Sequence, residues 1–559
     1  MKEKIENKIK EVLNSLGIEE DISFTIEHPD DLKNGDYSTN VAMVCAKSQK
    51  SNPRELAEKI KQEFEKDLPK EIEKVEIAGP GFINFYLSRE FFTESVKEVL
   101  EKGNDWGRSN IGNNEKVIVE YSSPNIAKPF TVGHLRSTII GDSIARIMTF
   151  NGCDVIRDNH LGDWGTQFGK LIVAIKKWGD LSEIEKSEEP IKDLVALYVK
   201  FHDEAEKDNS LEDEARAWFV KLEQKDSEAI SIWKKCIELS KKEFDRIYKK
   251  LGVSKFDTEY GESFFEDKMT AVIDDVKAKN LGKKSEGAYI IEFSEEKKLP
   301  PLLLLKSDGS SLYALRDLAA DKWRKKEYGD GIKIINEVGA EQTEYFRQIF
   351  EAEKMLGYFG EGKRKHVAHG LYRFKDGKMS TRKGNVIWLD DIIKEAEKRA
   401  GEINEESKEK VAIGSLKFND LKRDALKDIT FDWEEILNIK GDSGAYLQYS
   451  AVRAKSIYDK AGEFDLNNKK EIPEQVTELE KNIYKFPEIV EYSYVNTEPH
   501  HIAKYLTELA SAFNTFYGNT QILKDDNVYA KYHLDLVKAF YQTMKNGLWL
   551  LGIEVPERM

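Results

Sequence analysis

Apolar residues near the start of the chain recur at the spacing of an amphipathic helix, at Ile5, Ile9, Val12 and Leu16. A polar turn follows at residues 34–37, and a second helix is expected after Asn52 and Pro53. Strands are expected around residues 75–77 and 82–87. These elements predict a separate α/β module that covers residues 1–107.

The next stretch has the pattern of a βαβ unit: a strand at 116–121, a helix from about 132 to 150 and a strand near 154–157. Downstream, further elements predict the second half of a doubly wound, Rossmann-type parallel sheet. These are strands near 288–293, 301–305 and 332–337, a helix at about 341–356 and a strand at 366–370.

An acidic and helical stretch from about 175 to 285 separates the two halves, and we interpret it as an insertion. The catalytic domain is then expected over residues 108–395. From residue 396 to 559 the pattern is almost wholly helical, which predicts an all-α C-terminal domain. The predicted fold class is therefore a multidomain α/β protein, with no internal repeat.

Composition excludes several classes of protein. The chain begins with charged residues, and its longest conspicuous apolar run, residues 41–46, is far shorter than the roughly 20 residues of a membrane span. Cys45, Cys153 and Cys236 form no C-x-x-C pair, so we expect neither disulfides nor a zinc site. We expect a cytoplasmic protein without metal ligands.

The formal net charge of −15 at first argues against a nucleic-acid partner. Thirteen acidic and four basic residues lie between 180 and 215, which predicts a solvated helical face. Residues 363–383 hold eight basic residues and only Asp376 as an acid, which is a credible anion site. Because the charge is segregated, an RNA partner remains compatible with the sequence.

A loop with candidate chemistry joins the first strand of the βαβ unit to its helix. The ligand edge of an α/β sheet lies there, where backbone N–H groups and the helix dipole favour phosphates. Gly133 would let an adenine ring lie close to the backbone, and His134 could donate a hydrogen bond to the phosphates. A lone G-H pair is more often an ordinary helix start with a satisfied histidine.

A second loop, residues 378–385, favours a functional role for Gly133 and His134, because this loop is basic and follows a predicted sheet strand. Such a loop can close over a triphosphate and neutralise the leaving pyrophosphate. Together the two loops resemble the paired signatures of class I aminoacyl-tRNA synthetases, usually H-I-G-H and K-M-S-K-S. Neighbouring phrases at 120–125, 134–138, 159–167 and 446–449 resemble the arginyl-tRNA synthetase family in particular.

Two positions depart from the family pattern. Thr131 stands where the first histidine usually lies, and Thr381 stands where the second lysine usually lies. A hydroxyl can hydrogen-bond a phosphate but cannot carry charge. Lys378, Arg382 or Lys383 could supply the missing cation.

The resemblance implies an enzyme that activates arginine with ATP, accompanied by Mg²⁺, and transfers it from arginyl-adenylate to the 3′-terminal ribose of tRNA(Arg). It also implies a cytoplasmic monomer without a prosthetic group. The implied catalytic residues are Thr131, Gly133, His134, Lys378, Met379, Ser380, Arg382 and Lys383. The implied ATP-binding residues are Lys128, Thr131, Gly133, His134, Lys378 and Ser380.

A guanidinium needs carboxylates and planar acceptors around it. Tyr313 and Asp317 are four residues apart, so a helix would place both on one face. The alternative is that Asp317 pairs at the surface with Arg316 or Arg324. By resemblance the arginine pocket would contain Glu120, Ser122, Asn125, His134, Tyr313, Asp317 and Gln342.

The two ends of the chain resemble the tRNA-binding domains of the family. Aromatic and arginine side chains on a helix after Gly444 could stack on unpaired bases, although aromatics at helical spacing are more often core. The N-terminal module resembles the domain that contacts the tRNA elbow. The implied tRNA-binding residues are Asn34, Asp36, Tyr37, Asn40, Tyr446, Tyr449, Arg453 and Met559.

Two other functions fit parts of the pattern. A small-molecule nucleotidylyltransferase shares the first loop but would not need the long helical C-terminal region. A catalytically dead RNA-binding paralogue would explain Thr131 and Thr381. The presence of the site residues argues against it, namely Glu120, Asn125, His134 and Asp317.

Overall fold

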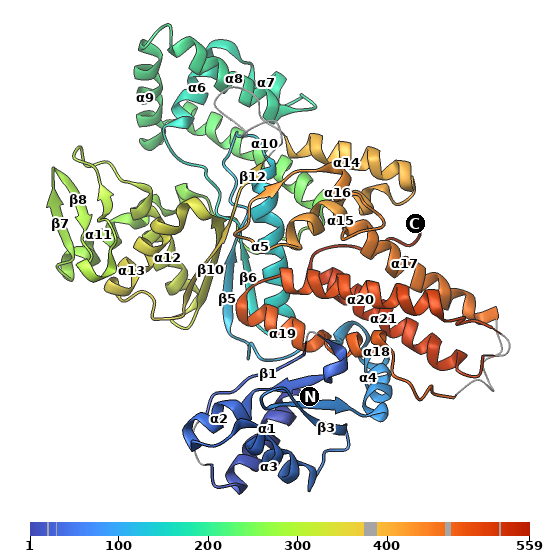
Figure 1. The fold of residues 1–559 in the computed structure, drawn as a ribbon. Helices are drawn as coiled ribbons and strands as arrows, with labels where there is room; N and C mark the ends of the chain where they lie inside the picture. The colour runs from blue at the N-terminus through green and yellow to red at the C-terminus, as the bar shows by residue number, and fades with distance from the viewer. Residues whose placement is uncertain (19–21, 30, 374–387, 464–470, 525–526) are drawn as a thin grey trace. The chain divides into compact units, whose positions relative to one another are not determined.

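The computed structural model describes the chain except residues 19–21, 30, 374–387, 464–470 and 525–526 (Figure 1). The chain forms two compact units, and each is assembled from separated segments. The first unit contains residues 1–106, 453–486 and 508–544, and the second contains residues 107–452, 487–507 and 545–559.

The N-terminal part of the first unit combines helices with strands, as the sequence predicts, and the structure shows that the strands form an antiparallel sheet. The strand order is β1-β2-β4-β3. Asn52 caps α3 by accepting from the backbone N–H groups of Arg54 and Glu55, with Pro53 at the first helical position. The elements are α1 (Lys2–Ser15), β1 (Ile26–Glu27), β2 (Tyr37–Thr39), α2 (Val41–Gln49), α3 (Pro53–Glu65), β3 (Ile72–Ala78), β4 (Phe82–Leu87) and α4 (Arg89–Lys102).

A tyrosine from far along the chain completes the core of this module. Tyr484 is 5% exposed and packs with the N-terminal apolar residues, its ring centroid 6.2 Å from that of Tyr37 and 5.6 Å from that of Phe92. Beside this contact, Arg89 donates to both Glu480 and the Tyr532 hydroxyl. The module and the C-terminal helices of this unit therefore share one core.

This burial corrects one expectation. Tyr37 is 0% exposed and Asp36 is 3% exposed, so neither side chain offers a surface to RNA in this structure. Asp36 instead accepts from the backbone N–H of Leu87 at 2.8 Å, which fixes the turn to the end of β4. The polar turn at 34–37 therefore has a structural role in the sheet.

The second unit is built on a four-stranded parallel sheet with the order β11-β10-β5-β6. The predicted βαβ unit is confirmed, with β5 (Lys116–Glu120), α5 (Val132–Phe150) and β6 (Asp154–Asp158). The later elements are α12 (Tyr313–Tyr328), β10 (Lys333–Gly339), α13 (Thr343–Leu356) and β11 (Arg364–His369).

The strands predicted at 288–293 and 301–305 exist but do not belong to the parallel sheet. They are β8 (Ala288–Ile291) and β9 (Leu302–Leu305), which pair antiparallel with β7 (Gly282–Ser285) in a separate sheet. Among the strands that the structure describes, β10 and β11 alone form the second half of the main sheet. A further two-stranded pair joins β12 (Tyr372–Arg373) to β13 (Ile429–Thr430).

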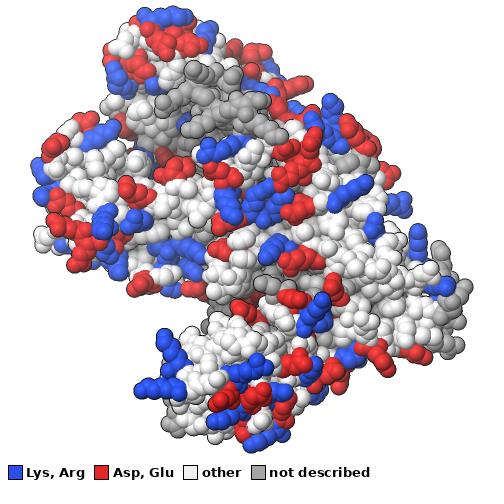
Figure 2. All heavy atoms as spheres, in the orientation of Figure 1, with Lys and Arg blue, Asp and Glu red and all other residues white. Residues whose placement is uncertain are grey.

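The predicted insertion is helical, and some of its acidic side chains pair with basic residues close to them in sequence. Lys192 lies 2.7 Å from Glu189, and Lys207 lies 2.9 Å from Glu204, each within one helical turn. Figure 2 shows acidic and basic side chains mixed over these helices at the top of the view. Its helices are α6 (Gln167–Trp178), α7 (Leu181–Ile184), α8 (Pro190–Ala205), α9 (Ser210–Glu223), α10 (Ser227–Leu251) and α11 (Met269–Ala278).

The chain after residue 388 is mainly helical, as predicted, and its last turn is fastened to α5. Ser143 donates to the Leu550 carbonyl at 2.8 Å. Lys417 donates to the Gly552 carbonyl at 2.6 Å, and its burial lowers the pKa of Lys417 to about 8. The helices are α14 (Leu389–Ile403), α15 (Lys408–Leu421), α16 (Trp433–Ile436), α17 (Gly444–Lys460), α18 (Glu478–Ile483), α19 (Phe486–Asn496), α20 (His500–Asn519) and α21 (Ala530–Leu550).

Among the described helices, none is both long and apolar enough to cross a membrane.

Candidate active site

A cavity of about 680 Å³ lies at the carboxyl ends of β5, β10 and β11, where an open parallel sheet binds its ligands. One wall of the cavity is formed by the start of α5 and the end of β11. The opposite wall is formed by α12 and α13. The lining includes the predicted residues Glu120, Ser122, Asn125, Thr131, Gly133, His134, Tyr313, Asp317 and Gln342.

The start of α5 presents a neutral histidine to this cavity. The backbone N–H of Thr131 donates to His134 Nδ1 at 3.0 Å, within a capping box. Burial and the nearby Lys128 lower the pKa of His134 to about 4. Because Nδ1 accepts from the backbone, Nε2 carries the proton and is the donor available to a ligand.

The loop between β5 and α5 is held in an unusual backbone conformation. Ser122, Ser123 and Ala127 have φ values of 70°, 44° and 54°, which cost free energy in residues other than glycine. Two of its contacts are with α10: the Ser122 hydroxyl lies 2.8 Å from that of Tyr248, and the Ala127 N–H donates to Ser240 at 2.9 Å. The insertion helix α10 thereby braces the loop.

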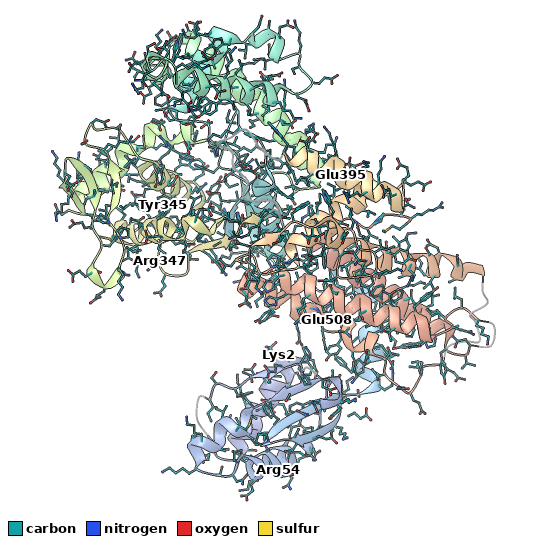
Figure 3. The ribbon with its side chains drawn as sticks, turned by 45° about the horizontal axis from the view of Figure 1, so that its top comes forward. Lys2, Arg54, Tyr345, Arg347, Glu395 and Glu508 are labelled. Carbon is teal, nitrogen blue, oxygen red and sulfur yellow. The ribbon has the colours of Figure 1, made fainter. Side chains whose placement is uncertain are left out.

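On the opposite wall, α12 carries Tyr313 and Asp317 on one face, as their spacing predicts. The surface alternative for Asp317 is not observed. Its carboxylate accepts from the hydroxyl of Tyr345 on α13 (Figure 3), while Arg316 Nε donates to Glu266 at 2.6 Å. Burial raises the pKa of Asp317, partly offset by nearby His160 and by Tyr345.

Beneath this wall lies a buried network of charges. Arg324 contacts Glu120 and Asp158 at 2.5 Å each and Asp321 at 2.8 Å. Arg364 continues the network to Asp321 at 2.9 Å. One oxygen of Glu120 is therefore occupied by Arg324, which joins the ends of β5 and β6 to α12.

Two lining residues, Glu262 and His160, carry chemistry that the sequence patterns missed. His160 is half-buried, and neither of its buried ring nitrogens has a hydrogen-bond partner in the described part of the chain. Burial raises the pKa of Glu262, although Arg316 lowers it. The chain places both residues together through a parallel bridge between Leu161 and Gly261, a non-local contact that no local pattern reveals.

Other predicted residues do not line this cavity. Lys128 lies outside the lining, and burial lowers its pKa. The expectations for Lys378, Met379, Ser380, Thr381, Arg382 and Lys383 fall outside the described residues. Elsewhere in the predicted basic segment, Lys363 pairs with Glu115 at 2.9 Å and Arg373 pairs with Asp428.

The candidate tRNA-binding residues of α17 have mixed environments. Leu447, Ala451 and Ala454 are buried, Tyr458 is half-buried, and Tyr449 is 37% exposed. Arg453 donates to Asn514 at 2.7 Å, and its guanidinium lies 5.1 Å from the centre of the Tyr517 ring. Asn34 is exposed, whereas Asn40 and Met559 are half-buried.

One cluster among the described residues has ligand atoms close enough to hold a metal ion. Glu498, His500 and His501 place these atoms within 4.8 Å of one another. They lie at the start of α20, whose positive dipole end disfavours a cation, and none of them lines the cavity. We therefore assign no metal to the site.

Three family models match the chain. The model described as "tRNA synthetases class I (R), catalytic domain" covers residues 95–433. The "DALR anticodon binding domain" covers residues 447–559, and the "Arginyl tRNA synthetase N terminal domain" covers residues 3–87.

Individual relatives agree with these models over nearly the whole length. The chain is 43% identical to the arginine–tRNA ligase of Clostridium botulinum over 548 residues, which is 96% of each chain. It is 42% identical to that of Halothermothrix orenii, covering 100% of this chain and 99% of the relative. The structure matches arginyl-tRNA synthetase from Plasmodium falciparum with a TM-score of 0.83 at 26% identity, covering 100% and 99% of the two chains.

Proposed function

Because the chain belongs to the arginine–tRNA ligase family of class I aminoacyl-tRNA synthetases, we propose that its cavity at the sheet edge binds arginine and ATP together. The family charges tRNA with arginine and uses ATP to do so, and this chain has that activity. One observation carries the proposal: a single cavity brings acidic side chains and the start of α5 to opposite walls.

The arginine side chain belongs to the wall formed by α12 and α13. Asp317 offers a carboxylate that is already oriented by the Tyr345 hydroxyl, and Glu262 offers a second one. Glu120 keeps its place through Arg324, so it can accept a hydrogen bond from the α-ammonium group without moving. Charged hydrogen bonds of this kind contribute about 1.5–3 kcal/mol each.

ATP belongs to the wall formed by α5 and β11. Gly133 leaves room for the adenine ring, because a Cβ atom added at this position would have only the Thr131 hydroxyl nearby, at 3.5 Å. The neutral His134 donates from Nε2 to a phosphate oxygen at the positive end of α5. We propose that Mg²⁺ accompanies the triphosphate as part of the substrate.

The reaction then follows from the two positions. The arginine carboxylate attacks the α-phosphorus in line, the bond from this phosphorus to the bridging oxygen breaks, and pyrophosphate leaves with the bonding electrons. In the second step a hydroxyl of the terminal ribose attacks the arginyl carbonyl, the bond from this carbon to the phosphate oxygen breaks, and AMP leaves with the bonding electrons while the hydroxyl proton is released. The protein contributes orientation and stabilisation of developing charge rather than a covalent intermediate.

A radiolabelled arginine-charging assay with tRNA(Arg) and ATP tests this proposal. We expect charging that requires both ATP and tRNA, and no charging with lysine, which cannot fill a bidentate acceptor site. A protein that binds tRNA but forms no arginyl-tRNA would be the catalytically dead paralogue instead. We further propose that the enzyme acts as a monomer in the cytoplasm, which gel filtration and fractionation can check.

A further inference from the structure

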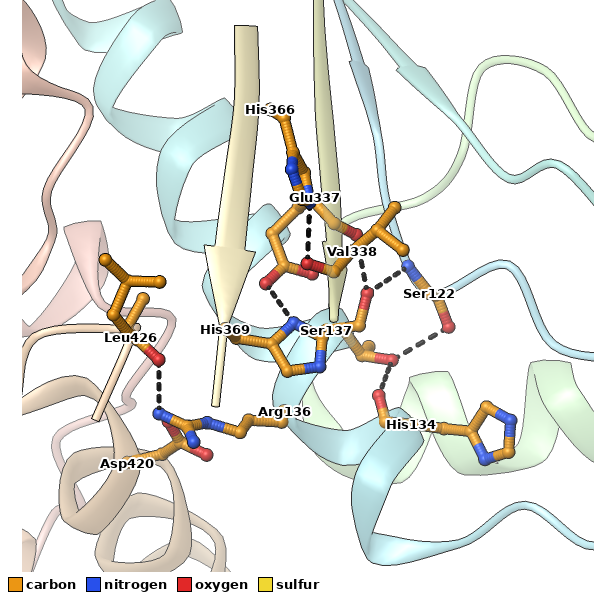
Figure 4. A network of polar contacts seen from close by, with 12 residues as sticks. Ser122, His134, Arg136, Ser137, Glu337, Val338, His366, His369, Asp420 and Leu426 are labelled. Atoms are coloured by element: carbon orange, nitrogen blue, oxygen red, sulfur yellow. Dashed lines mark hydrogen bonds and ion pairs between the residues drawn. The ribbon is translucent and has the colours of Figure 1, made fainter. Parts of the chain in front are cut away.

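A buried histidine–carboxylate pair lies at the end of the ATP-side wall. His369 is the last residue of β11, and its Nδ1 is 2.7 Å from Glu337 Oε1 on β10 (Figure 4). The side chains are 12% and 0% exposed, respectively, and both residues line the cavity. The second carboxylate oxygen, Glu337 Oε2, has no hydrogen-bond partner within the described chain.

The backbone of Glu337 is hydrogen-bonded to the first turns of α5, where Gly133 leaves room for a planar ring. Ser137 is one turn after Gly133, and its hydroxyl donates to the Glu337 carbonyl at 3.1 Å. The same hydroxyl accepts from the backbone N–H of Ser122 at 3.1 Å. These contacts tie α5 and the β5 loop to β10, so Gly133 and His369 belong to walls of the same slot.

The hydrogen bond to Glu337 determines what His369 offers to a ligand. An ionised carboxylate only accepts, so Nδ1 carries a proton and donates to Oε1. In the neutral imidazole, Nε2 is then a bare acceptor, and in the imidazolium it becomes a donor. A fixed carboxylate behind a histidine in this way sets both its tautomer and its orientation.

We propose that His369, held by Glu337, reads the 6-position of the purine ring of ATP, with neutral Nε2 accepting a hydrogen bond from the 6-amino group. This inference rests on the proposed position of ATP in the cavity. A 6-oxo purine presents an acceptor at the same place, so the neutral imidazole discriminates against it. The imidazolium has the opposite preference, because its Nε2–H donates to a 6-oxo group.

The protonation of the pair therefore controls base preference. Burial lowers the pKa of His369, but the charge and hydrogen bond of Glu337 outweigh it and leave the pKa above 6.5. The charge of Arg136 on α5 lowers the pKa of His369, and the charge of Asp420 on α15 raises it. His366, on the same strand, is itself electrostatically coupled to His369. Burial also raises the pKa of Glu337, so both members of the pair bind a proton more readily than the free side chains do.

The test compares ATP with inosine triphosphate, which differs in having a 6-oxo group. We expect the ratio of kcat/KM for ATP to that for inosine triphosphate, measured in tRNA charging, to rise about tenfold as pH increases through the pKa of His369. Groups that act equally on both nucleotides cancel in this ratio. His369→Phe should flatten the pH profile and raise the KM for ATP about tenfold while leaving the KM for arginine unchanged.

Three further variants make the result specific. Glu337→Gln should shift the profile to lower pH, because the charge that raises the pKa is gone. His369→Gln should give a low ratio that does not change with pH, because its carboxamide can accept from a 6-amino group or, after a flip, donate to a 6-oxo group and does not titrate. His366→Phe is the matched control on the same strand: His366 lies outside the cavity lining and contacts the Val338 carbonyl at 3.0 Å, so the ratio above the pKa of His369 should not change. The lost electrostatic interaction with His369 should at most shift the pH profile slightly.

The outcomes separate this inference from the proposed function. If the wild-type protein does not charge tRNA with arginine, the proposed function itself is wrong. Wild-type charging with a pH-independent ratio would overturn only the role of His369. If His369→Phe affects both nucleotides equally, His369 contacts the phosphates rather than the base, and the inference is likewise wrong. Calorimetric titration of ATP and inosine triphosphate into wild type and His369→Phe gives the same comparison without turnover.

Discussion

His134 acts within the proposed site as an oriented, uncharged donor. Its Nδ1 is occupied by the Thr131 N–H, and its pKa of about 4 keeps the ring neutral in the working range. His134→Ala should lower the rate of adenylate formation about 10²–10³-fold, the usual loss for one such donor. His134→Gln should retain more activity than His134→Asn, because its longer amide places an N–H near the position of Nε2.

Single-turnover formation of arginyl-adenylate, measured with tRNA present, checks this order of activities. The rate attributable to His134 should also stay constant between pH 6 and 8. A titration of that rate near pH 6.5, or equal rates for all three variants, would show that the imidazole is not the donor.

Asp317 is expected to determine the affinity for arginine. Asp317→Asn keeps the shape and removes the charge, so the KM for arginine should rise by roughly one to two powers of ten while the KM for ATP changes little. Burial raises the pKa of Asp317, so the wild-type affinity should fall as acidification protonates the carboxylate. The variant should lack that pH dependence.

Steady-state titration of arginine at saturating ATP and tRNA measures both effects. Asp330→Asn is a suitable control because this exposed acid lies 3.4 Å from Lys325, away from the cavity. An unshifted arginine curve for Asp317→Asn would remove this carboxylate from the pocket.

Sequence patterns could identify residues that share a local motif but not those that meet only in the fold. Tyr313 and Asp317 follow from helical spacing, and Gly133 and His134 follow from a loop at a sheet edge. Glu262 reaches the cavity only because its segment pairs with the strand end near Leu161. The pairing of Glu337 with His369 depends likewise on the neighbouring places of β10 and β11.

At the scale of elements, Arg324 holds the floor of the cavity together. It bridges β5, β6 and α12 through buried carboxylates, and removing one partner of a buried pair typically costs about 3–5 kcal/mol. Arg324→Met should lower the free energy of unfolding of the second unit by that amount, because Glu120 and Asp158 lose their guanidinium partner, while Asp321 keeps its ion pair with Arg364. Urea unfolding followed by tryptophan fluorescence measures the loss.

Arg347→Met is the matched control, because Arg347 lies exposed on α13 (Figure 3). It should change stability by no more than about 0.5 kcal/mol. Equal stabilities for the two variants would show that the Arg324 network contributes nothing net.

The elements themselves were predictable where their signals are local. The predicted bounds of α5 agree with the structure because a capping motif opens the helix and apolar residues continue to Phe150. The partners of β8 and β9 were not predictable. An apolar run shows that a strand exists, whereas its sheet depends on contacts with β7, and here those contacts are antiparallel.

At the scale of the whole molecule, tRNA recognition has to involve surfaces away from the cavity. Tyr449 of α17 is 37% exposed, and stacking on one base contributes about 1–3 kcal/mol. Tyr449→Ala should therefore raise the KM for tRNA about 5- to 150-fold and leave the KM for arginine unchanged. Leu447→Ala, at a fully buried neighbour, should instead lower stability by about 2–5 kcal/mol. Filter binding of tRNA and thermal melting distinguish the two effects.

The N-terminal module should depend on the C-terminal helices of its own unit for stability. Its core includes Tyr484, whose ring contacts those of Tyr37 and Phe92, and its Arg89 donates to the largely buried Glu480. Residues 1–106 expressed alone should therefore unfold with low cooperativity, because the aromatic cluster loses a ring and Arg89 loses its carboxylate. In the full chain, Tyr484→Ala should cost about 3–5 kcal/mol by leaving a cavity in this core, in the range for a large aromatic.

Hydrogen exchange provides the measurement, because it reports the stability of each segment separately. Tyr484→Ala should accelerate exchange in α2, α3 and β4 while the amides of α5 stay protected, and the KM for arginine should not change. Tyr492→Ala is the control: Tyr492 is 53% exposed and lies outside this core, so exchange in the module should match the wild type. If residues 1–106 alone unfold as cooperatively as they do in the full chain, the module folds independently. Tyr484 would then only pack against a module that is already folded.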